Sequence, residues 1–150
     1  LIIKVKIKLI CCIGLDYDLN LVPHFSKHYS QYNIDSFHFI LNKKDEFNTI
    51  DYLQYFTNLN STRVTFHTWV GEFNSIDKIN KFNKIIEPSS ESHILLADVD
   101  EFQIHKGKIN SDYVWGNLID RVANNNLSKK VTKRDLNKQF PLKSKIMKIL

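Results

Sequence analysis

Runs of β-forming residues alternate with runs of helical periodicity along the chain, and this alternation limits the folds open to it. Apolar residues first alternate with lysines and then continue unbroken from Leu9 to Ile13, which is typical of a strand that becomes covered on both faces. Further strands are expected at residues 36–42, 63–70, 93–97 and 113–123. Because strands that alternate with helices form parallel pairs, the order β-α-β-α-β-α-β predicts an α/β fold with a mostly parallel sheet flanked by helices.

Three segments between these strands carry apolar residues at spacings of three and four, as amphipathic helices do. The first is expected to be capped by Asp18 and to run to about Tyr32. The second is expected to be capped by Asp45 and the third by Ser75. On the third helix, the residues expected to face the core are Ile76, Ile79, Phe82 and Ile86.

The composition agrees with one folded domain. The chain has 150 residues, of which 43% are hydrophobic, and this is enough to bury an apolar core. No internal repeat or linker divides it, so residues 1–150 are expected to form a single domain.

Charge and cysteine content bear on partners and location. The net charge is +5, but the lysines are scattered and only the stretch from Lys129 to Lys148 resembles a basic tract, so no nucleic-acid partner is expected. No apolar run is long enough for a transmembrane segment. The neighbouring Cys11 and Cys12 are interpreted as reduced, because a disulfide between adjacent residues is strained, and this favours a cytoplasmic location.

A strand that ends in two closely spaced carboxylates is the strongest chemical feature. The apolar residues 93–97 stop at Asp98-Val99-Asp100. Alternate side chains of a strand end project to one side, so Asp98 and Asp100 can converge, and their oxygens suit Mn²⁺ or Mg²⁺ with positions left for phosphate oxygens. Asp16 and Asp18 have the same spacing, so the position after the strand, and not the spacing alone, favours the later pair.

Polar residues also follow the earlier strands. In open parallel sheets, ligands bind beyond the carboxyl ends of the strands. Gly14, Asp16 and Asp18 follow the first expected strand, Asn42 ends the second, and Asp98 follows the fourth. These residues are therefore expected to face one cleft and to contact a ligand there.

These segments, in this order, resemble a known family. Asp98-Val99-Asp100-Glu101-Phe102 after a hydrophobic strand resembles the motif of a family-2-like group of the GT-A glycosyltransferases, whose sheet is Rossmann-like. Residues 16–25 followed by His28-Tyr29 resemble the group's first loop and helix, and residues 37–42 resemble its second strand. Weaker likenesses follow at residues 116–123 and 139–141. The first loop departs from the group, which usually has Asn-Glu where this chain has Asp16-Tyr17-Asp18.

The resemblance implies a nucleoside-diphosphate-sugar donor, a divalent metal on Asp98 and Asp100, and displacement at the sugar's anomeric carbon, with inversion favoured. The acceptor, whether glycan, lipid or protein, stays open. Inversion needs a general base, and Asp120 is the only later acid nominated for it, although an ion pair with Arg121 is the commoner role of such a residue. Because the chain is short for this family, it is expected to be a fragment of a longer enzyme that transfers little or no sugar by itself.

Two other functions stay open. A strand ending in Asp-x-Asp also begins the site of haloacid-dehalogenase phosphohydrolases, but there the motif normally follows the first strand and lacks Glu101-Phe102. The lysine-rich stretch would suit a module that binds nucleic acid or anionic lipid without catalysis. His24 and His28 have a spacing that can bind zinc, but no third ligand is evident.

Overall fold

The computed structural model describes residues 6–59, 63–88, 92–104, 118–122, 131–132 and 135–146. Contacts within the chain group it into two compact units, Leu1–Gln103 and Ile104–Leu150, and each is described by itself. The single domain expected from the sequence stays a prediction. None of the helices in the described ranges combines the length and the apolar composition that a membrane crossing requires.

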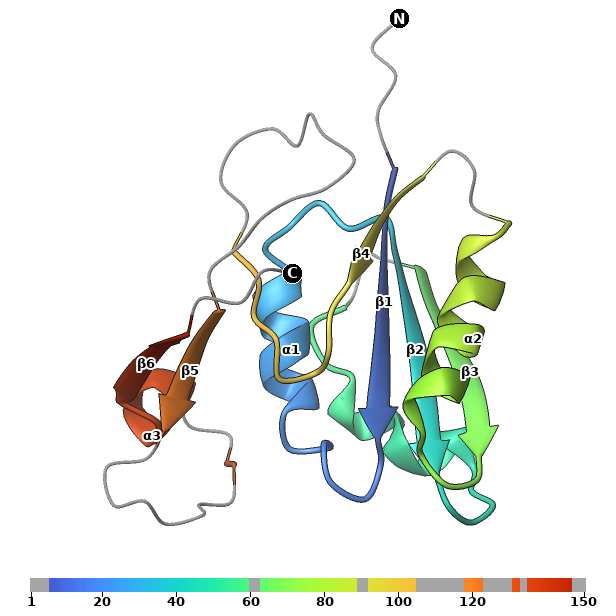
Figure 1. The fold of residues 1–150 in the computed structure, drawn as a ribbon, viewed down its shortest axis with the longest axis horizontal. Helices are drawn as coiled ribbons and strands as arrows, with labels where there is room; N and C mark the ends of the chain where they lie inside the picture. The colour runs from blue at the N-terminus through green and yellow to red at the C-terminus, as the bar shows by residue number, and fades with distance from the viewer. Residues whose placement is uncertain are drawn as a thin grey trace, which may run out of the picture. The chain divides into compact units, whose positions relative to one another are not determined.

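The first unit is built on a sheet of 4 parallel strands in the order β3-β2-β1-β4 (Figure 1). These strands are β1 (Lys6–Gly14), β2 (Ser36–Lys43), β3 (Arg63–Val70) and β4 (Ser92–Leu96). The predicted α/β class, with a Rossmann-like parallel sheet flanked by helices, is confirmed. The chain first adds β2 and β3 on one side of β1 and then β4 on the other, so the strand order reverses at β1. The carboxyl ends of β1 and β4 are therefore neighbours at the place where such sheets bind ligands.

Helices cover both faces of this sheet (Figure 1). The helix α1 (Val22–Tyr29) lies on one face and α2 (Ser75–Ile86) on the other. Successive side chains of β1 point alternately to the two faces, so its central residues had to be apolar without interruption. Those that pack on the α1 face are Leu9, Cys11 and Ile13, and those on the α2 face are Ile10 and Cys12.

The helix α1 is shorter than predicted, and Asp18 is not its cap. Its N-cap is Leu21, which makes no capping hydrogen bond through its side chain, and the helix ends at Tyr29 and not near Tyr32. Asp18 instead binds the backbone of the turn that follows β1, so the helix begins only at Val22. Pro23 suits this start because a first-turn residue needs no N–H donor.

The connection between β2 and β3 contains a 3₁₀-helix, η1 (Thr49–Tyr55), where the sequence predicted an α-helix. Asn48, and not Asp45, starts it, since the Asn48 side chain accepts a hydrogen bond from Ile50 N at 3.1 Å. Tyr52 and Tyr55, three residues apart, pack against the core. That spacing matches the three residues per turn of a 3₁₀-helix. The prediction of an α-helix capped by Asp45 was therefore wrong both in the type of helix and in its cap.

The helix α2 begins at Ser75, but Asn74 is its cap, accepting a hydrogen bond from Asp77 N at 2.8 Å. Two of the four residues predicted to face the core do not: Ile76 is 74% exposed and Ile79 is 56% exposed. Ile85 is buried beside Phe82 instead. Each residue of an α-helix is rotated by about 100° from the one before, so the apolar residues of this segment fit more than one stripe along the helix. The sheet covers only the stripe that contains Phe82 and Ile85.

The second unit contains two antiparallel strands, β5 (Leu118–Val122) and β6 (Leu142–Ile146), and the short helix α3 (Leu136–Gln139). Asp135 caps α3 by accepting hydrogen bonds from the backbone N–H groups of Asn137 and Lys138. The strand predicted at residues 113–123 contains β5, and residues 113–117 and 123 lie outside the described residues.

Truncation of Ile85 and of Ile79 distinguishes the observed packing of α2 from the packing predicted by periodicity. Ile85→Ala is expected to lower the free energy of unfolding by about 2–5 kcal/mol, because it leaves a cavity against the sheet. Ile79→Ala is expected to change it by less than about 0.5 kcal/mol, because the side chain is exposed. Urea unfolding of both variants measures the difference, and equal losses would contradict the observed face.

Candidate functional site

The turn after β1 is closed by Asp18. The Asp18 carboxylate accepts a hydrogen bond from Gly14 N at 2.8 Å, while Asp18 N donates to Gly14 O at 2.8 Å. A Cβ atom on Gly14 would lie 3.2 Å from the Asp18 Oδ2 atom, so the absence of a side chain lets the carboxylate approach. Leu15 N donates to Asn42 O at 2.9 Å and ties the turn to the end of β2. Asp18 is thereby held at the carboxyl edge of the sheet.

The residues after β4 present their carboxylates outwards. Ala97 and Val99 are buried in the α1-side core, whereas Asp98 is half-buried and Asp100 is exposed. Glu101 closes this turn, since its N–H donates to Asp98 O at 2.8 Å and its carboxylate accepts from Asp98 N at 3.2 Å. The carboxylates of Asp98 and Asp100 are therefore accessible to a ligand, at least in part. The Glu101 carboxylate is instead engaged with the backbone of Asp98.

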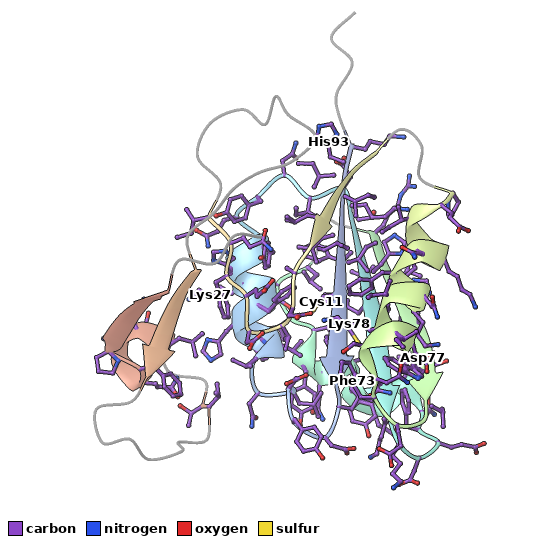
Figure 2. All side chains as sticks on the ribbon, viewed as in Figure 1. Cys11, Lys27, Phe73, Asp77, Lys78 and His93 are labelled. Carbon is purple, nitrogen blue, oxygen red and sulfur yellow. The ribbon has the colours of Figure 1, made fainter. Side chains whose placement is uncertain are left out.

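Lys78 reaches this edge from the other face of the sheet. It lies near the start of α2, as Figure 2 shows. Its ammonium forms an ion pair with the Asp98 carboxylate. The same ammonium lies 5.5 Å from the centre of the Phe82 ring, which favours this position through a cation–π interaction. The sequence analysis missed Lys78. The available signal was topological, because a helix that follows a parallel strand begins at the carboxyl edge of the sheet.

The negative charges of Asp98 and Asp100 act on Asp18. Burial raises the pKa of Asp18, and the negative charges of Asp100 and Asp98 add to that rise, while the hydrogen bond from Gly14 and the charge of Lys78 oppose it. The structure therefore brings together three of the residues predicted for the site. Lys78 pairs with Asp98, and its charge also acts on Asp18. The three carboxylates together would attract a cation placed among them.

Asn42 has a structural task at the same edge. Its buried side-chain amide donates to Trp69 O at 3.1 Å and to Gly71 O at 3.0 Å. Both amide hydrogens therefore hold the end of β3, where Gly71 has a φ of +129° that favours glycine. Contact between Asn42 and a nucleotide stays a prediction.

Two other predicted residues are not brought into this cluster by the described contacts. Asp16 is exposed and its carboxylate lies 3.6 Å from the Lys43 ammonium. Asp120 lies on β5 in the second unit, opposite Ser144 of β6, and its role as general base stays a prediction.

Two side chains of α1, and Tyr32 shortly after its end, hold the loop after Asp100. The Tyr29 hydroxyl donates to Glu101 O at 2.9 Å and accepts from Gln103 N at 3.1 Å. His28 Nε2 donates to Gln103 O at 2.8 Å, and its ring meets Phe102 edge-on at 5.4 Å. The Tyr32 hydroxyl also donates to Gln103 O, at 3.2 Å. The His28-Tyr29 pair noted in the sequence therefore orients the backbone that follows the carboxylates.

The described residues of this site do not supply a complete set of protein ligands for a metal ion. Within the described ranges, no group of three or more His, Cys, Asp and Glu side chains is arranged to hold a metal. His28 is engaged with the loop, and none of the residues that the structure describes joins it and His24 as a third zinc ligand. Mn²⁺ and Mg²⁺ need few protein ligands when phosphate oxygens and water complete the coordination, so Asp98 and Asp100 fit such an ion on a phosphate ligand.

Removal of the Tyr29 hydroxyl tests the anchoring of this loop. Tyr29→Phe leaves Glu101 O and Gln103 N without this partner, and it is expected to lower the free energy of unfolding by about 1–3 kcal/mol. Hydrogen exchange at the Gln103 amide is expected to accelerate. Tyr17→Phe is the matched control because Tyr17 is 89% exposed. If exchange at Gln103 were the same in both variants, α1 would not be what holds the loop.

Comparison of the chain with models of known protein families, with curated proteins and with solved structures finds no significant match. The case for a function therefore rests on the chemistry of Asp18, Lys78, Asp98 and Asp100 and on their place at the end of the sheet.

Proposed function

We propose that the carboxyl edge of β1 and β4 binds the diphosphate of a nucleoside-diphosphate sugar through a divalent cation, and that the chain serves in sugar transfer. The observation that carries this proposal is the place of Asp98 and Asp100. They follow β4 beside the end of β1, where the strand order reverses, and they face outwards from a buried Ala97 and Val99. The resemblance of residues 98–102 to the GT-A motif points to the same ligand.

The donor set fits a hard cation that is shared with phosphate. Carboxylate oxygens are ligands that Mg²⁺ and Mn²⁺ accept, and an exposed Asp100 leaves room for a diphosphate. A bound Mn²⁺ or Mg²⁺ would offset the charge that builds on the leaving diphosphate. The backbone contacts from Gly14 to Asp18 and from Asp98 to Glu101 keep the two turns in place for such a ligand.

Lys78 has a defined part in this proposal. Without a cation, its ammonium is the partner of Asp98. A cation on Asp98 competes with that ammonium, since both are drawn to the same carboxylate. The displaced Lys78 would still lie at the edge of the sheet, where a diphosphate binds, and a lysine is suited to phosphate as a point charge.

Asp120 is kept as the nominated general base, and the acceptor is a glycan, lipid or protein. A base must lie within hydrogen-bond reach of the acceptor hydroxyl. Loss of transfer in Asp120→Asn with unchanged donor binding would support that role.

Nucleotide binding should depend on the metal and on Asp100. We expect UDP or GDP to bind with Mn²⁺ present and to lose about tenfold or more in affinity with a chelator or in Asp100→Ala, because metal and diphosphate complete each other's coordination. Isothermal titration of the nucleotide measures this. Glu87→Ala is the matched control, since Glu87 is an exposed carboxylate just beyond the other end of α2.

Two results would count against the proposal. One is equal nucleotide affinity with and without chelator. The other is release of inorganic phosphate from a simple phosphate ester that is lost in Asp98→Asn, which would favour the phosphohydrolase alternative.

Removal of the Lys78 charge should raise metal affinity. Lys78→Met is expected to bind Mn²⁺ about two- to fivefold more tightly, because the metal then no longer has to displace the Lys78 ammonium from the Asp98 carboxylate. Paramagnetic-resonance titration of free Mn²⁺ measures the affinity, with Lys27→Met, an exposed lysine on α1, as control. In an Asp98→Asn background the gain should shrink. An equal gain with and without Asp98 would mean that Lys78 acts only through its distant charge.

A further inference from the structure

The two edge strands of the parallel sheet differ in what occupies their outer edges. The strand order is β3-β2-β1-β4, so β3 and β4 are the edges (Figure 1). Ala97 N donates to Ile10 O on β1, so by alternation the C=O group of Leu96 points away from the sheet. The Gln103 side chain donates to that oxygen at 2.8 Å. The chain itself therefore blocks the outer edge of β4 at its end.

The outer edge of β3 has no such cover in the part of the chain that the structure describes. Gly71 N donates to Lys43 O at 2.9 Å, so the backbone of Gly71 points toward β2. Alternate residues of a strand point their N–H and C=O groups to the same side, so Trp69 and His67 point toward β2 as well. The residues between them, whose groups point outward, are Val64, Phe66, Thr68 and Val70. Within the described ranges, no hydrogen bond engages these outward groups.

The composition of β3 does not protect this open edge. Exposed edges are usually guarded by lysine, by proline, by a bulge or by short length. After Arg63, the strand contains no Lys, Asp, Glu or Pro, and its register with β2 runs without a bulge to Val70. It has 8 residues, against 5 in β4. An edge of this kind is suited to pair with a further strand.

We infer that β3 pairs in antiparallel fashion with β3 of a second copy of this chain, which joins the two parallel sheets into one. A contact between identical surfaces must be complementary to itself under a two-fold rotation. A two-fold axis beside His67 gives every outward group a partner, because the outward residues are spaced evenly about that position. The pairs are Val64 with Val70, and Phe66 with Thr68, each formed twice.

Charges near the ends of β3 favour this antiparallel arrangement. Arg63 begins the strand, and Glu72, whose side chain is 75% exposed, follows its end. In the antiparallel pair, Arg63 of each copy lies opposite Gly71 of the other copy and next to Glu72. Glu72 already pairs with Lys44 of its own chain, so Arg63 joins an existing ion pair.

The two His67 side chains would face each other at the two-fold axis, and their charge state bears on the contact. Burial, and then the charge of Lys8, lower the pKa of His67. Both imidazoles are therefore neutral at neutral pH and do not repel each other.

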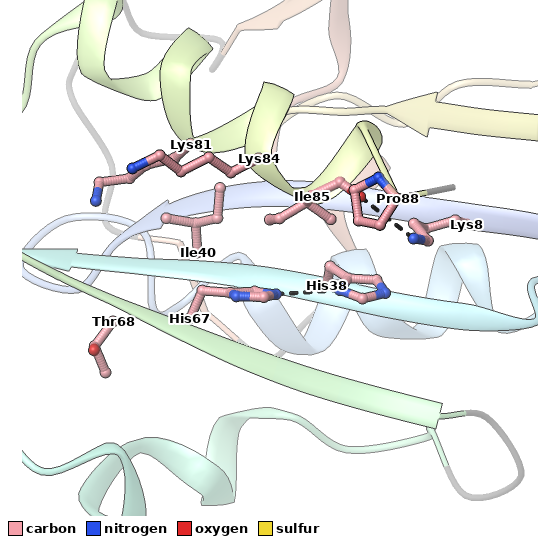
Figure 3. A pocket seen from close by; sticks show the side chains of 9 residues that line it. All are labelled: Lys8, His38, Ile40, His67, Thr68, Lys81, Lys84, Ile85 and Pro88. Carbon is pink, nitrogen blue, oxygen red and sulfur yellow. Dashed lines mark hydrogen bonds between the residues drawn. The ribbon is translucent and has the colours of Figure 1, made fainter. Parts of the chain in front are cut away.

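Thr68 is the position at which this pairing can be blocked. Its side chain is exposed, and in Figure 3 it projects away from the His38–His67 pair of the two neighbouring strands. Its N–H points outward, so Thr68→Pro removes a donor from the proposed contact and none from the pairing with β2. Thr68→Lys keeps the N–H and places a charge on the edge.

Sedimentation velocity of the full chain measures the association. A single pair of edge strands makes a small interface, so we expect a dimer with a Kd on the order of 10–100 µM. Thr68→Pro and Thr68→Lys are each expected to weaken it about tenfold or more. Asn80→Lys adds the same charge at an exposed position of α2 and is the matched control. Circular dichroism checks that the variants are folded, and Thr68→Lys decides the matter if Thr68→Pro unfolds.

Hydrogen exchange locates the contact on the strand. The outward amides of Phe66 and Thr68 are expected to exchange more slowly as the chain concentration rises through the Kd. The amide of His67, which points toward β2, is expected to exchange at the same rate throughout.

Three outcomes would overturn this inference. The first is a chain that stays monomeric up to about tenfold above the expected Kd range. The second is a dimer whose affinity is the same in Thr68→Lys and in Asn80→Lys. The third is full protection of the Phe66 and Thr68 amides in the dilute monomer, which would mean that the chain covers its own edge.

Discussion

Parallel pairing of β1 with β2 on one side and with β4 on the other is the constraint from which the rest of the structure follows. Parallel strands need crossover connections. The connection from β1 to β2 contains α1, and the connection from β3 to β4, which runs along the sheet in the opposite direction, contains α2, so right-handed crossovers place the two helices on opposite faces. Both faces of β1 must then be apolar, as its run from Leu9 to Ile13 is. The same pairing makes the turn at Gly14 and the turn at Asp98 neighbours, although more than half of the chain separates them.

The strands could be predicted because the sheet requires a property of neighbouring residues, namely that several in a row are apolar. A strand covered on both faces needs consecutive apolar residues, and β1 and β2 contain them. The helices were less predictable because several stripes of apolar residues at spacings of three and four fit the same segment. Only the position of the sheet decides that Ile85 is buried and that Ile79 is exposed. Asp18 was misassigned for a related reason, since a carboxylate before a helix satisfies either the helix or the preceding turn.

Of the candidate site, too, one part could be predicted from local sequence and another part could not. Asp98 and Asp100 follow a strand directly, so their place at the edge could be inferred from order alone. Lys78 was not singled out, because no local pattern links it to Asp98, 20 residues further along the chain, and only the topology of the sheet does. The anchor formed by Tyr29 spans 72 residues to Glu101, and no local pattern distinguishes a tyrosine that packs from one that also holds a distant loop. Long-range contacts of this kind position the Asp98 carboxylate and the loop that follows Asp100.

Charge is distributed unevenly along α2, and this bears on the stability of the fold. Near the start of the helix, Lys78 faces an excess of carboxylates, whereas further along Lys81 and Lys84 line a pocket that has no carboxylate among its described residues. Like charges held together oppose folding, and an ion of the opposite sign that binds only the folded chain offsets that cost by mass action. A cation that binds among the carboxylates at the edge of the sheet would therefore stabilise the fold. The helix that completes the α2-side core thus also carries the lysine that balances the Asp98 carboxylate, so removal of Lys78 would raise the attraction of this edge for a cation without touching the core residues Phe82 and Ile85.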